Sequence, residues 1–170
     1  SMHKSYNPLM AIKVISELLK IIPSASLFMI GPDKDGSQSE CVKYSRELSI
    51  EKSIHFTGAL KKSSWINLSK DCDIFINTTN YDNMPVSVIE AMALGLPVVS
   101  TNPGGIKYLL IDSENALLVP RNDVHGMVEK IKLLINDSAM TTNLSINARK
   151  RANLFCWQNV KADWLSLLAL

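Results

Sequence analysis

Two carboxylates frame the start of a predicted helix near the middle of the chain. Asp82 stands in a polar, turn-like run, Pro85 follows at the expected first helical position, and Glu90 comes eight residues after Asp82. Proline suits the first helical position because the amide hydrogen that it lacks would have no partner there. The amides that follow are then free donors at the positive end of the helix dipole, which favours a bound phosphate. These amides belong to Val86, Ser87 and Val88.

The two carboxylates suit a different chemical group from the one that the amides suit. Glu90 lies about one and a half turns into the helix, and helical side chains lean toward the N-terminus, so Glu90 can reach the helix start. A carboxylate repels phosphate but accepts hydrogen bonds from hydroxyls, and the vicinal hydroxyls of a ribose or hexose suit it well. Phosphate on the amides and hydroxyls on the carboxylates together describe a sugar nucleotide.

A purely structural interpretation of the same residues stays open. An Asp just ahead of a helix is commonly an N-cap, and a Glu near a helix start complements the helix dipole. Because such acids are frequent at helix starts, their spacing alone favours the structural interpretation over the binding site.

The elements that must position these residues alternate along the chain. Short apolar runs bounded by turn residues predict strands, and apolar residues at helical spacing predict helices. The expected strands are residues 25–31, 53–58, 72–78, 97–101 and 115–120; the expected helices are residues 8–22, 38–49, 63–71, 85–94, a short segment after Gly105, and 123–168 in three pieces broken near Asp137 and Phe155. This alternation predicts an α/β fold with a Rossmann-like, doubly wound parallel sheet. In such sheets the ligand lies beyond the carboxyl ends of the strands, which is where Asp82 falls.

Length and composition indicate one globular domain. The chain has 170 residues and a formal net charge of +2, which is too small to favour nucleic acid or an anionic membrane as the main partner. Its scattered cysteines are expected to be reduced thiols and not disulfides or metal ligands: Cys41, Cys72 and Cys156. No apolar run reaches the length of a transmembrane helix, and no secretory leader precedes the first predicted helix.

Residues 80–105 resemble the signature of the retaining glycosyltransferases with two Rossmann domains (the GT-B type), family 4, also called group 1. That signature is an acid, seven residues, a Glu, then Ala-Met-Ala-x-Gly-x-Pro-Val-Val and a Gly pair. Here Asp82 and Glu90 are the two acids, and the run AMALGLPVVSTNPGG follows them. Weaker similarity extends over nearly the whole chain, for instance in SIHFTGAL and in FCWQNVKADWLSLL.

The resemblance implies that residues 1–170 are a nucleotide-sugar-binding C-terminal domain, a fragment of a two-domain glycosyltransferase. It implies a UDP- or GDP-sugar donor, transfer with retention to a glycan or lipid-linked acceptor, and neither a metal nor another cofactor. Glu90 would bind the ribose hydroxyls and Asp82 would face the transferred sugar, and these two are the expected catalytic residues. The implied nucleotide-sugar contacts are Thr57 and Gly58 beside the base, Asn83 and Met84 in the loop, the amides around Pro85, Val86 and Ser87 on the diphosphate, and Glu90.

The chain departs from the family pattern in three ways. Asp82 is one methylene shorter than the family's Glu, which shortens its reach to the sugar. The first strand of the domain appears nowhere ahead of the first helix, and because this strand is central in a doubly wound sheet, we expect a gap or a partner strand in its place. The family's Arg and Lys that bind the diphosphate lie just ahead of this helix. Here only Lys4 stands there, and we expect it to be a solvated residue and not a diphosphate ligand. The acceptor-binding N-terminal domain is expected outside these residues, in a cytoplasmic enzyme that contacts the inner membrane face peripherally.

Two alternatives from other functional classes remain. A sugar-nucleotide epimerase of similar fold would need catalytic acids in addition to Glu90. A non-catalytic nucleotide-binding module, such as a receiver-like domain, would need acids clustered after its first strand and a Lys after its last one, a pattern that Asp33 and Lys34 do not supply. The Ala-Met-Ala-x-Gly-x-Pro-Val-Val run favours the glycosyltransferase and places the epimerase second.

Overall fold

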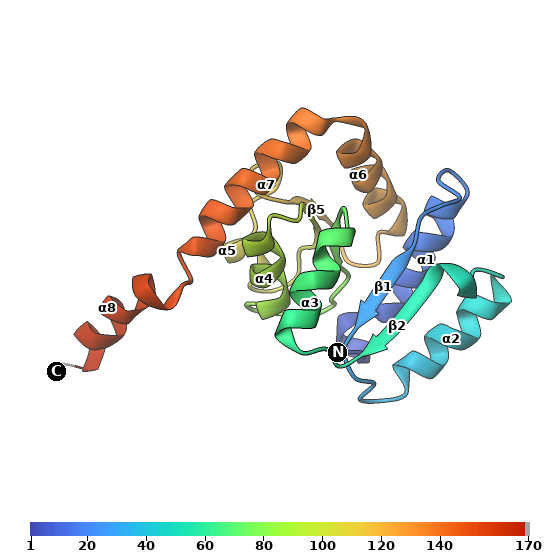
Figure 1. Cartoon of the computed structure of the whole chain (residues 1–170), viewed down its shortest axis with the longest axis horizontal. Coiled ribbons are helices and arrows are strands. Elements are labelled where there is room, and N and C mark those ends of the chain that lie inside the picture. The colour runs from blue at the N-terminus through green and yellow to red at the C-terminus, as the bar shows by residue number, and fades with distance from the viewer. Residues whose placement is uncertain (169–170) are drawn as a thin grey trace.

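The computed structural model describes residues 1–168 and shows an α/β fold of short strands and longer helices (Figure 1). The strands are β1 (Leu27–Ile30), β2 (Ile54–Gly58), β3 (Phe75–Asn77), β4 (Val98–Thr101) and β5 (Leu117–Val119). The α-helices are α1 (Pro8–Leu19), α2 (Ser37–Glu47), α3 (Lys62–Leu68), α4 (Val86–Leu94), α5 (Ile106–Leu109), α6 (Val124–Asn136), α7 (Ser138–Asn153) and α8 (Trp157–Leu168), with short 3₁₀ turns η1 (Lys4–Tyr6), η2 (Glu51–Ser53) and η3 (Ser69–Asp71). Each predicted strand and helix is present, and the tail forms three helices as predicted.

The strand pairs are all parallel, which confirms the predicted Rossmann-like architecture. β1 pairs with β2 in one sheet, and β3, β4 and β5 form a second sheet in that order. β1 and β3 are each paired along one edge only. Residues 25–26 and 72–74 lie outside the paired registers, so the strands are shorter than the apolar runs 25–31 and 72–78 from which they were predicted.

The segment ahead of α1 lies between the two sheets. Its Met2 amide donates to the Pro32 carbonyl at 2.9 Å, and its Met2 carbonyl accepts from the Lys34 amide at 3.0 Å, just beyond β1. Three residues later the Ser5 carbonyl accepts from the Asn80 amide at 2.8 Å, beyond β3. This segment therefore joins the carboxyl ends of β1 and β3, at the place where the sequence predicted a gap or a partner strand.

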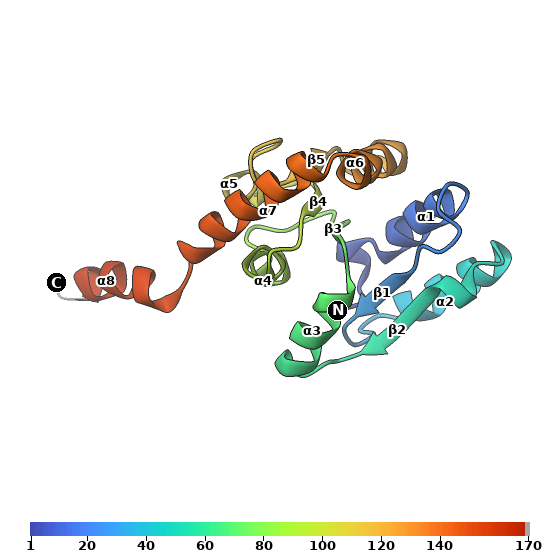
Figure 2. The ribbon, with the colours of Figure 1, turned by 45° about the horizontal axis from the view of Figure 1, so that its top comes forward.

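Helices cover both faces of the β3–β4–β5 sheet, as neighbouring residues of β4 show. Val99 is buried in a core cluster with residues of α1 and α6, whereas Val98 is buried in a second cluster with residues of α4, α5 and α7. Successive side chains of a strand point to opposite faces, so the two clusters lie on opposite faces of the sheet. Figure 2 shows α4 and α6 on different sides of β4.

The last helix, α8, extends away from the rest of the chain in both views (Figures 1 and 2). None of its residues is buried, and Trp157 is 62% exposed. The two helices before it begin at side-chain caps, since Asp123 accepts from the Gly126 amide and Asp137 from the Met140 amide. No helix in residues 1–168 is long and apolar enough to cross a membrane.

Candidate functional site

The loop between β3 and α4 rests on the Gly pair that follows β4. The Gly105 amide donates to the Asp82 carbonyl at 3.0 Å. Gly104 has a φ of +58°, and a Cβ on it would stand 2.6 Å from the Asp82 carbonyl oxygen. A Cβ on Gly105 would stand 2.8 Å from Asn83 Cα. Side chains at either glycine would push the loop away, so the Gly pair fixes where Asp82 and Asn83 lie.

The same loop is held from the other side by the chain's N-terminal segment. Thr78 Oγ1 donates to the carbonyls of Tyr6 (2.9 Å) or Asn7 (3.0 Å), and Thr79 Oγ1 is 3.2 Å from the Ser5 carbonyl. Thr78 and Thr79 are both buried. The loop that carries Asp82 is thus fixed to two distant segments of the chain before it enters α4.

The N-terminus of α4 is open. Pro85 occupies the N-cap position with φ −68° and ψ 113°, one residue before the helix, so its predicted place as the first helical residue is wrong by one position. The Val88 amide, predicted to be free, instead donates to the Pro85 carbonyl at 3.1 Å because the first turn is tightened. No backbone or side-chain acceptor for the Val86 and Ser87 amides is found in residues 1–168. These two amides remain as donors for an external anion.

Glu90 is on α4, and its carboxylate has a partner that the sequence did not reveal. Lys62 Nζ, at the start of α3, lies 2.9 Å from Glu90 Oε1. The Glu90 side chain is 30% exposed and that of Lys62 is 72% exposed. Asp82 is half-buried, and its side chain makes no ion pair among the residues that the structure describes. Both predicted carboxylates are therefore accessible to a ligand.

The predicted base-side residues end β2. Thr57 is half-buried, and its hydroxyl lies 3.1 Å from the Gly58 carbonyl and 3.4 Å from the Met29 carbonyl. Gly58 has a φ of +65°, and nothing lies within 4 Å of where its Cβ would stand. The turn after β2 thus presents open backbone, which leaves room for a flat ring.

The remaining loop residues line the outer part of this region. Asn83 is exposed and Met84 is 45% exposed. Arg121, which follows β5, has its guanidinium 5.4 Å from the centre of the Tyr81 ring. Sequence reasoning missed Arg121, although its place directly after a predicted strand marks it as a residue at the same edge of the sheet.

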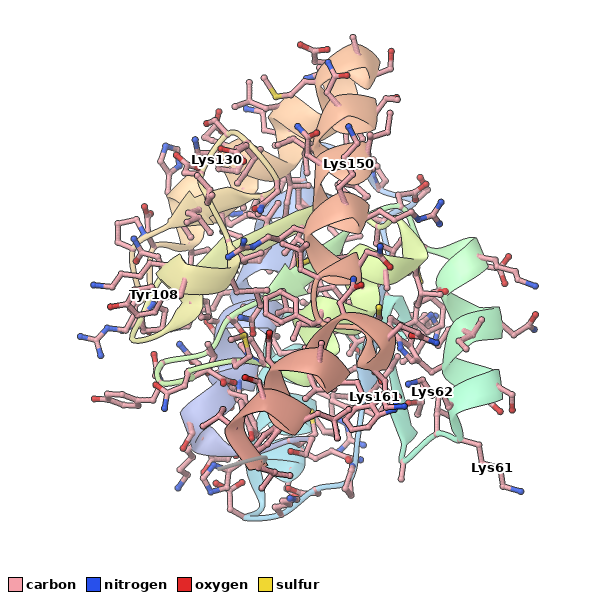
Figure 3. All side chains as sticks on the ribbon, turned by 90° about the vertical axis from the view of Figure 1, so that its left-hand side faces the viewer. Lys61, Lys62, Tyr108, Lys130, Lys150 and Lys161 are labelled. Atoms are coloured by element: carbon pink, nitrogen blue, oxygen red, sulfur yellow. The ribbon has the colours of Figure 1, made fainter. Side chains whose placement is uncertain are left out.

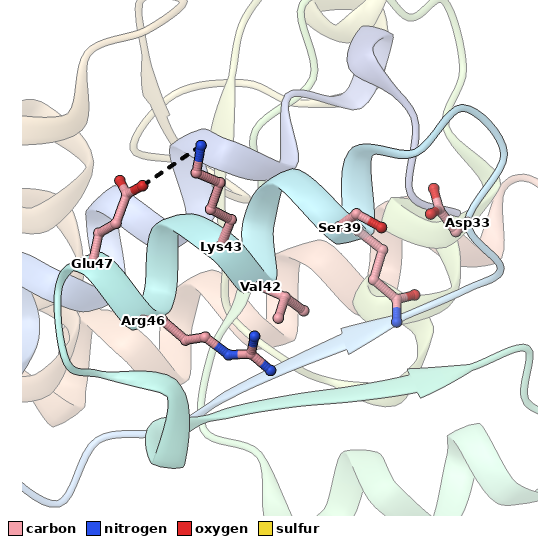
Figure 4. A pocket seen from close by; sticks show the side chains of 7 residues that line it. Asp33, Ser39, Val42, Lys43, Arg46 and Glu47 are labelled. Atoms are coloured by element: carbon pink, nitrogen blue, oxygen red, sulfur yellow. Dashed lines mark ion pairs between the residues drawn. The ribbon is translucent and has the colours of Figure 1, made fainter.

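Two hollows on the chain lie away from the candidate site. One, of about 570 Å³, runs along the exposed face of α2 and contains the Lys43–Glu47 ion pair at 4.0 Å (Figure 4). Another lies where the end of α4 meets α7, between Gly95 and Arg149. Neither contains Asp82 or Glu90. The candidate site is an open surface built from strand ends and a helix start, and within residues 1–168 no cluster of three or more acidic, His or Cys side chains is arranged to hold a metal ion.

Curated proteins similar to this chain are glycosyltransferases. An uncharacterized glycosyltransferase of Haemophilus influenzae is 30% identical over 159 residues, which cover 92% of this chain and 44% of that protein. The capsular polysaccharide biosynthesis glycosyltransferase CapM of Staphylococcus aureus is 31% identical over 108 residues, which cover 61% of this chain and 28% of that protein. The chain therefore spans less than half the length of these relatives.

Solved structures share the fold of this chain, and one of them is a domain of a glycosyltransferase. HepE of Anabaena, in complex with UDP and glucose, is 21% identical with a TM-score of 0.89, and the match covers 99% of this chain and 46% of that one. The C-terminal domain of the group 1 glycosyltransferase LpcC of Francisella tularensis is 22% identical with a TM-score of 0.77, covering 90% of this chain and 80% of that one. At these identities the likeness establishes the fold, here that of a GT-B glycosyltransferase domain.

The family itself is established by a match over most of the sequence. Residues 1–151 match the profile described as glycosyl transferases group 1. This range contains β1 to β5, the loop on the Gly pair and both carboxylates. The chain belongs to the glycosyl transferases group 1 family.

Proposed function

We propose that the chain is the donor-binding domain of a retaining, family 4 glycosyltransferase, a hexosyltransferase that uses a nucleotide-diphosphate sugar. The Val86 and Ser87 amides hold the diphosphate, Glu90 accepts from the ribose hydroxyls, and Asp82 faces the transferred sugar. The base lies beside the open turn at Thr57 and Gly58. Asn83, Met84 and Pro85 shape the loop over the donor.

The open N-terminus of α4 with Glu90 accessible beside it carries this proposal. A helix start with unpaired amides favours an anion, and the nearby carboxylate favours hydroxyls. A nucleoside diphosphate supplies both groups, because its phosphates are attached to the same ribose that carries the vicinal hydroxyls. UDP is the first nucleotide to test, because HepE was solved with UDP, and GDP is the comparison.

Acceptor binding belongs, in this proposal, to an N-terminal domain outside these residues. The acceptor is a glycan or a lipid-linked sugar, and the whole enzyme works in the cytoplasm, touching the inner membrane face through that other domain. Transfer requires donor and acceptor in one cleft that excludes water. We therefore expect no transfer from UDP-glucose or another nucleotide sugar to glycan acceptors by the 170-residue chain alone, measured as release of the donor's nucleoside diphosphate. Turnover by the purified chain would contradict this.

Replacing Val86 by proline tests the amide site directly. Val86 is 66% exposed, and the backbone of Pro85 before it is extended, which is the conformation that a residue preceding proline prefers. The substitution therefore removes one amide hydrogen at a helix position that tolerates proline. We expect UDP binding to weaken by about 1 kcal/mol, roughly fivefold, in isothermal titration calorimetry.

The matched comparisons are the Val86→Ala variant and the ligand uridine. Val86→Ala keeps the amide and should bind UDP as the wild type does. Uridine lacks the diphosphate, so its affinity should be the same for Val86→Pro and the wild type. Equal UDP affinity in all three proteins would show that the Val86 amide does not contact phosphate.

A further inference from the structure

The ion pair between Lys62 and Glu90 joins two parts of the proposed donor site. Lys62 begins α3, four residues after the Gly58 turn, whereas Glu90 is on α4. Lys62 Nζ and Glu90 Oε1 are 2.9 Å apart, and no other ion pair of Glu90 is found in residues 1–168. Figure 3 labels Lys62 on the side of α3 toward the rest of the chain and Lys61 directed outward.

The position of Lys62 runs against the local preference of its helix. The N-terminus of a helix favours acidic side chains, yet α3 has Lys61 at its N-cap, Lys62 next, no side-chain cap and no acid in its first turn. Positions that break local rules are often those with a role in function. In the structure the carboxylate that compensates this cation is supplied from another helix, by Glu90.

A carboxylate paired in this way can still bind a ribose. Each carboxylate oxygen accepts about two hydrogen bonds, so a Lys on Oε1 leaves Oε2 and part of Oε1 for hydroxyls. Without such a partner, a partly exposed glutamate side chain would lose rotational freedom when a ligand binds it, and this loss costs free energy. Holding the carboxylate beforehand reduces that cost and so increases affinity.

We propose that Lys62 is a positioning residue for the nucleotide: it holds the Glu90 carboxylate in the orientation that receives the ribose hydroxyls. This inference rests on the proposed donor site and names the residue that orients it. Because Lys62 acts through Glu90, its contribution depends on the ribose and not on the phosphates. It also disappears when Glu90 is removed.

The experiment compares Lys62→Met with Lys61→Met by titration of UDP, uridine and 2′-deoxy-UDP. Methionine keeps the apolar stem of lysine and removes the charge, and Lys61 is the neighbouring cation, which makes no ion pair in residues 1–168. We expect Lys62→Met to weaken UDP and uridine alike, by about three- to fivefold. Lys62→Arg should restore most of the affinity, and Lys61→Met should bind as the wild type does.

A Glu90→Ala background separates positioning from direct contact. There the Lys62→Met substitution should change UDP affinity by less than twofold. Three results would overturn the inference: an unchanged affinity in Lys62→Met, a higher affinity because Lys62 competes with the ribose, or the same loss in the Glu90→Ala background because Lys62 contacts phosphate. Thermal unfolding of each variant shows whether it is folded.

The outcomes for the two proposals are distinguishable. Wild-type protein that binds neither UDP nor GDP overturns the donor site and the positioning role together. UDP binding that depends on Glu90 but not on Lys62 upholds the donor site and overturns the positioning role alone. Binding that depends on both residues, without additivity, supports both.

Discussion

Replacing Glu90 by alanine is expected to weaken UDP binding by about 1.5–3 kcal/mol, roughly 10- to 150-fold. The physical reason is that, in the proposed site, two ribose hydroxyls would lose a charged acceptor whose place no neighbouring group would take. Because the ribose is present in uridine as well, uridine should lose a similar factor. Isothermal titration calorimetry of the wild type and the variant measures both changes.

The ligand offers a second route to the same contact. 2′-Deoxy-UDP lacks one of the hydroxyls, so it should bind the wild type more weakly than UDP does, and Glu90→Ala should narrow or remove that difference. Glu51→Ala is the matched control, since Glu51 is an exposed carboxylate in η2, just before β2, whereas the proposed base-side residues Thr57 and Gly58 end that strand. A Glu90→Ala protein that binds UDP within twofold of the wild type would rule out the ribose contact.

Titration of Asp82→Ala in parallel distinguishes the proposed role of Asp82 from that of Glu90. Asp82 is proposed to face the transferred sugar, which UDP lacks, so UDP affinity should stay near the wild-type value. Affinity for UDP-glucose should fall. A loss for UDP as large as that in Glu90→Ala would mean that Asp82 also contacts the nucleotide.

Replacing Gly104 by alanine is expected to lower the free energy of unfolding by about 2–4 kcal/mol. Gly104 has a φ of +58°, which a residue with a Cβ adopts at a cost of about 1–2 kcal/mol. The added Cβ would also stand 2.6 Å from the Asp82 carbonyl oxygen, so the loop must move. Urea unfolding followed by circular dichroism measures the change in free energy.

The Gly36→Ala variant is the control that separates the cost of a positive φ from the cost of the contact with the Asp82 carbonyl. Gly36 has a φ of +84°, and nothing lies within 4 Å of its Cβ position. The free energy of unfolding of Gly36→Ala should therefore fall by only about 1–2 kcal/mol. Gly104→Ala should in addition weaken UDP binding, because the displaced loop leads directly into α4. Equal destabilisation by the two substitutions, with UDP affinity unchanged in both, would show that the Gly pair does not support the loop.

The type and order of the elements could be read from local patterns. Apolar periodicity distinguished strands from helices, and Pro8 begins α1 as a proline at a first helical position should. The alternation of strand and helix then indicated a parallel sheet, because a parallel pair requires a crossover connection. The motif around Asp82 and Glu90 pointed to the family that the sequence comparison established.

The predicted ends of strands and helices were less accurate than their types, for reasons that lie outside each segment. β3 begins at Phe75 and not at residue 72, because a strand is ordered only where a neighbour pairs with it. Pro85 precedes α4 and does not open it, because its backbone is extended (ψ 113°) while its carbonyl accepts from the first-turn amides of Val88 and Ile89. Propensity alone does not decide either boundary.

Contacts between distant segments came only from the folded chain. The Lys62–Glu90 pair, the support of Asp82 by the Gly pair and the attachment of Thr78 to the segment ahead of α1 each join residues far apart in sequence. Local patterns predict whether a residue faces the core or the solvent, but not which other helix, strand or loop packs against it. That choice follows from how the helices and the two sheets pack, and it is this packing that seats the loop of Asp82 on the Gly pair and brings Glu90 to Lys62.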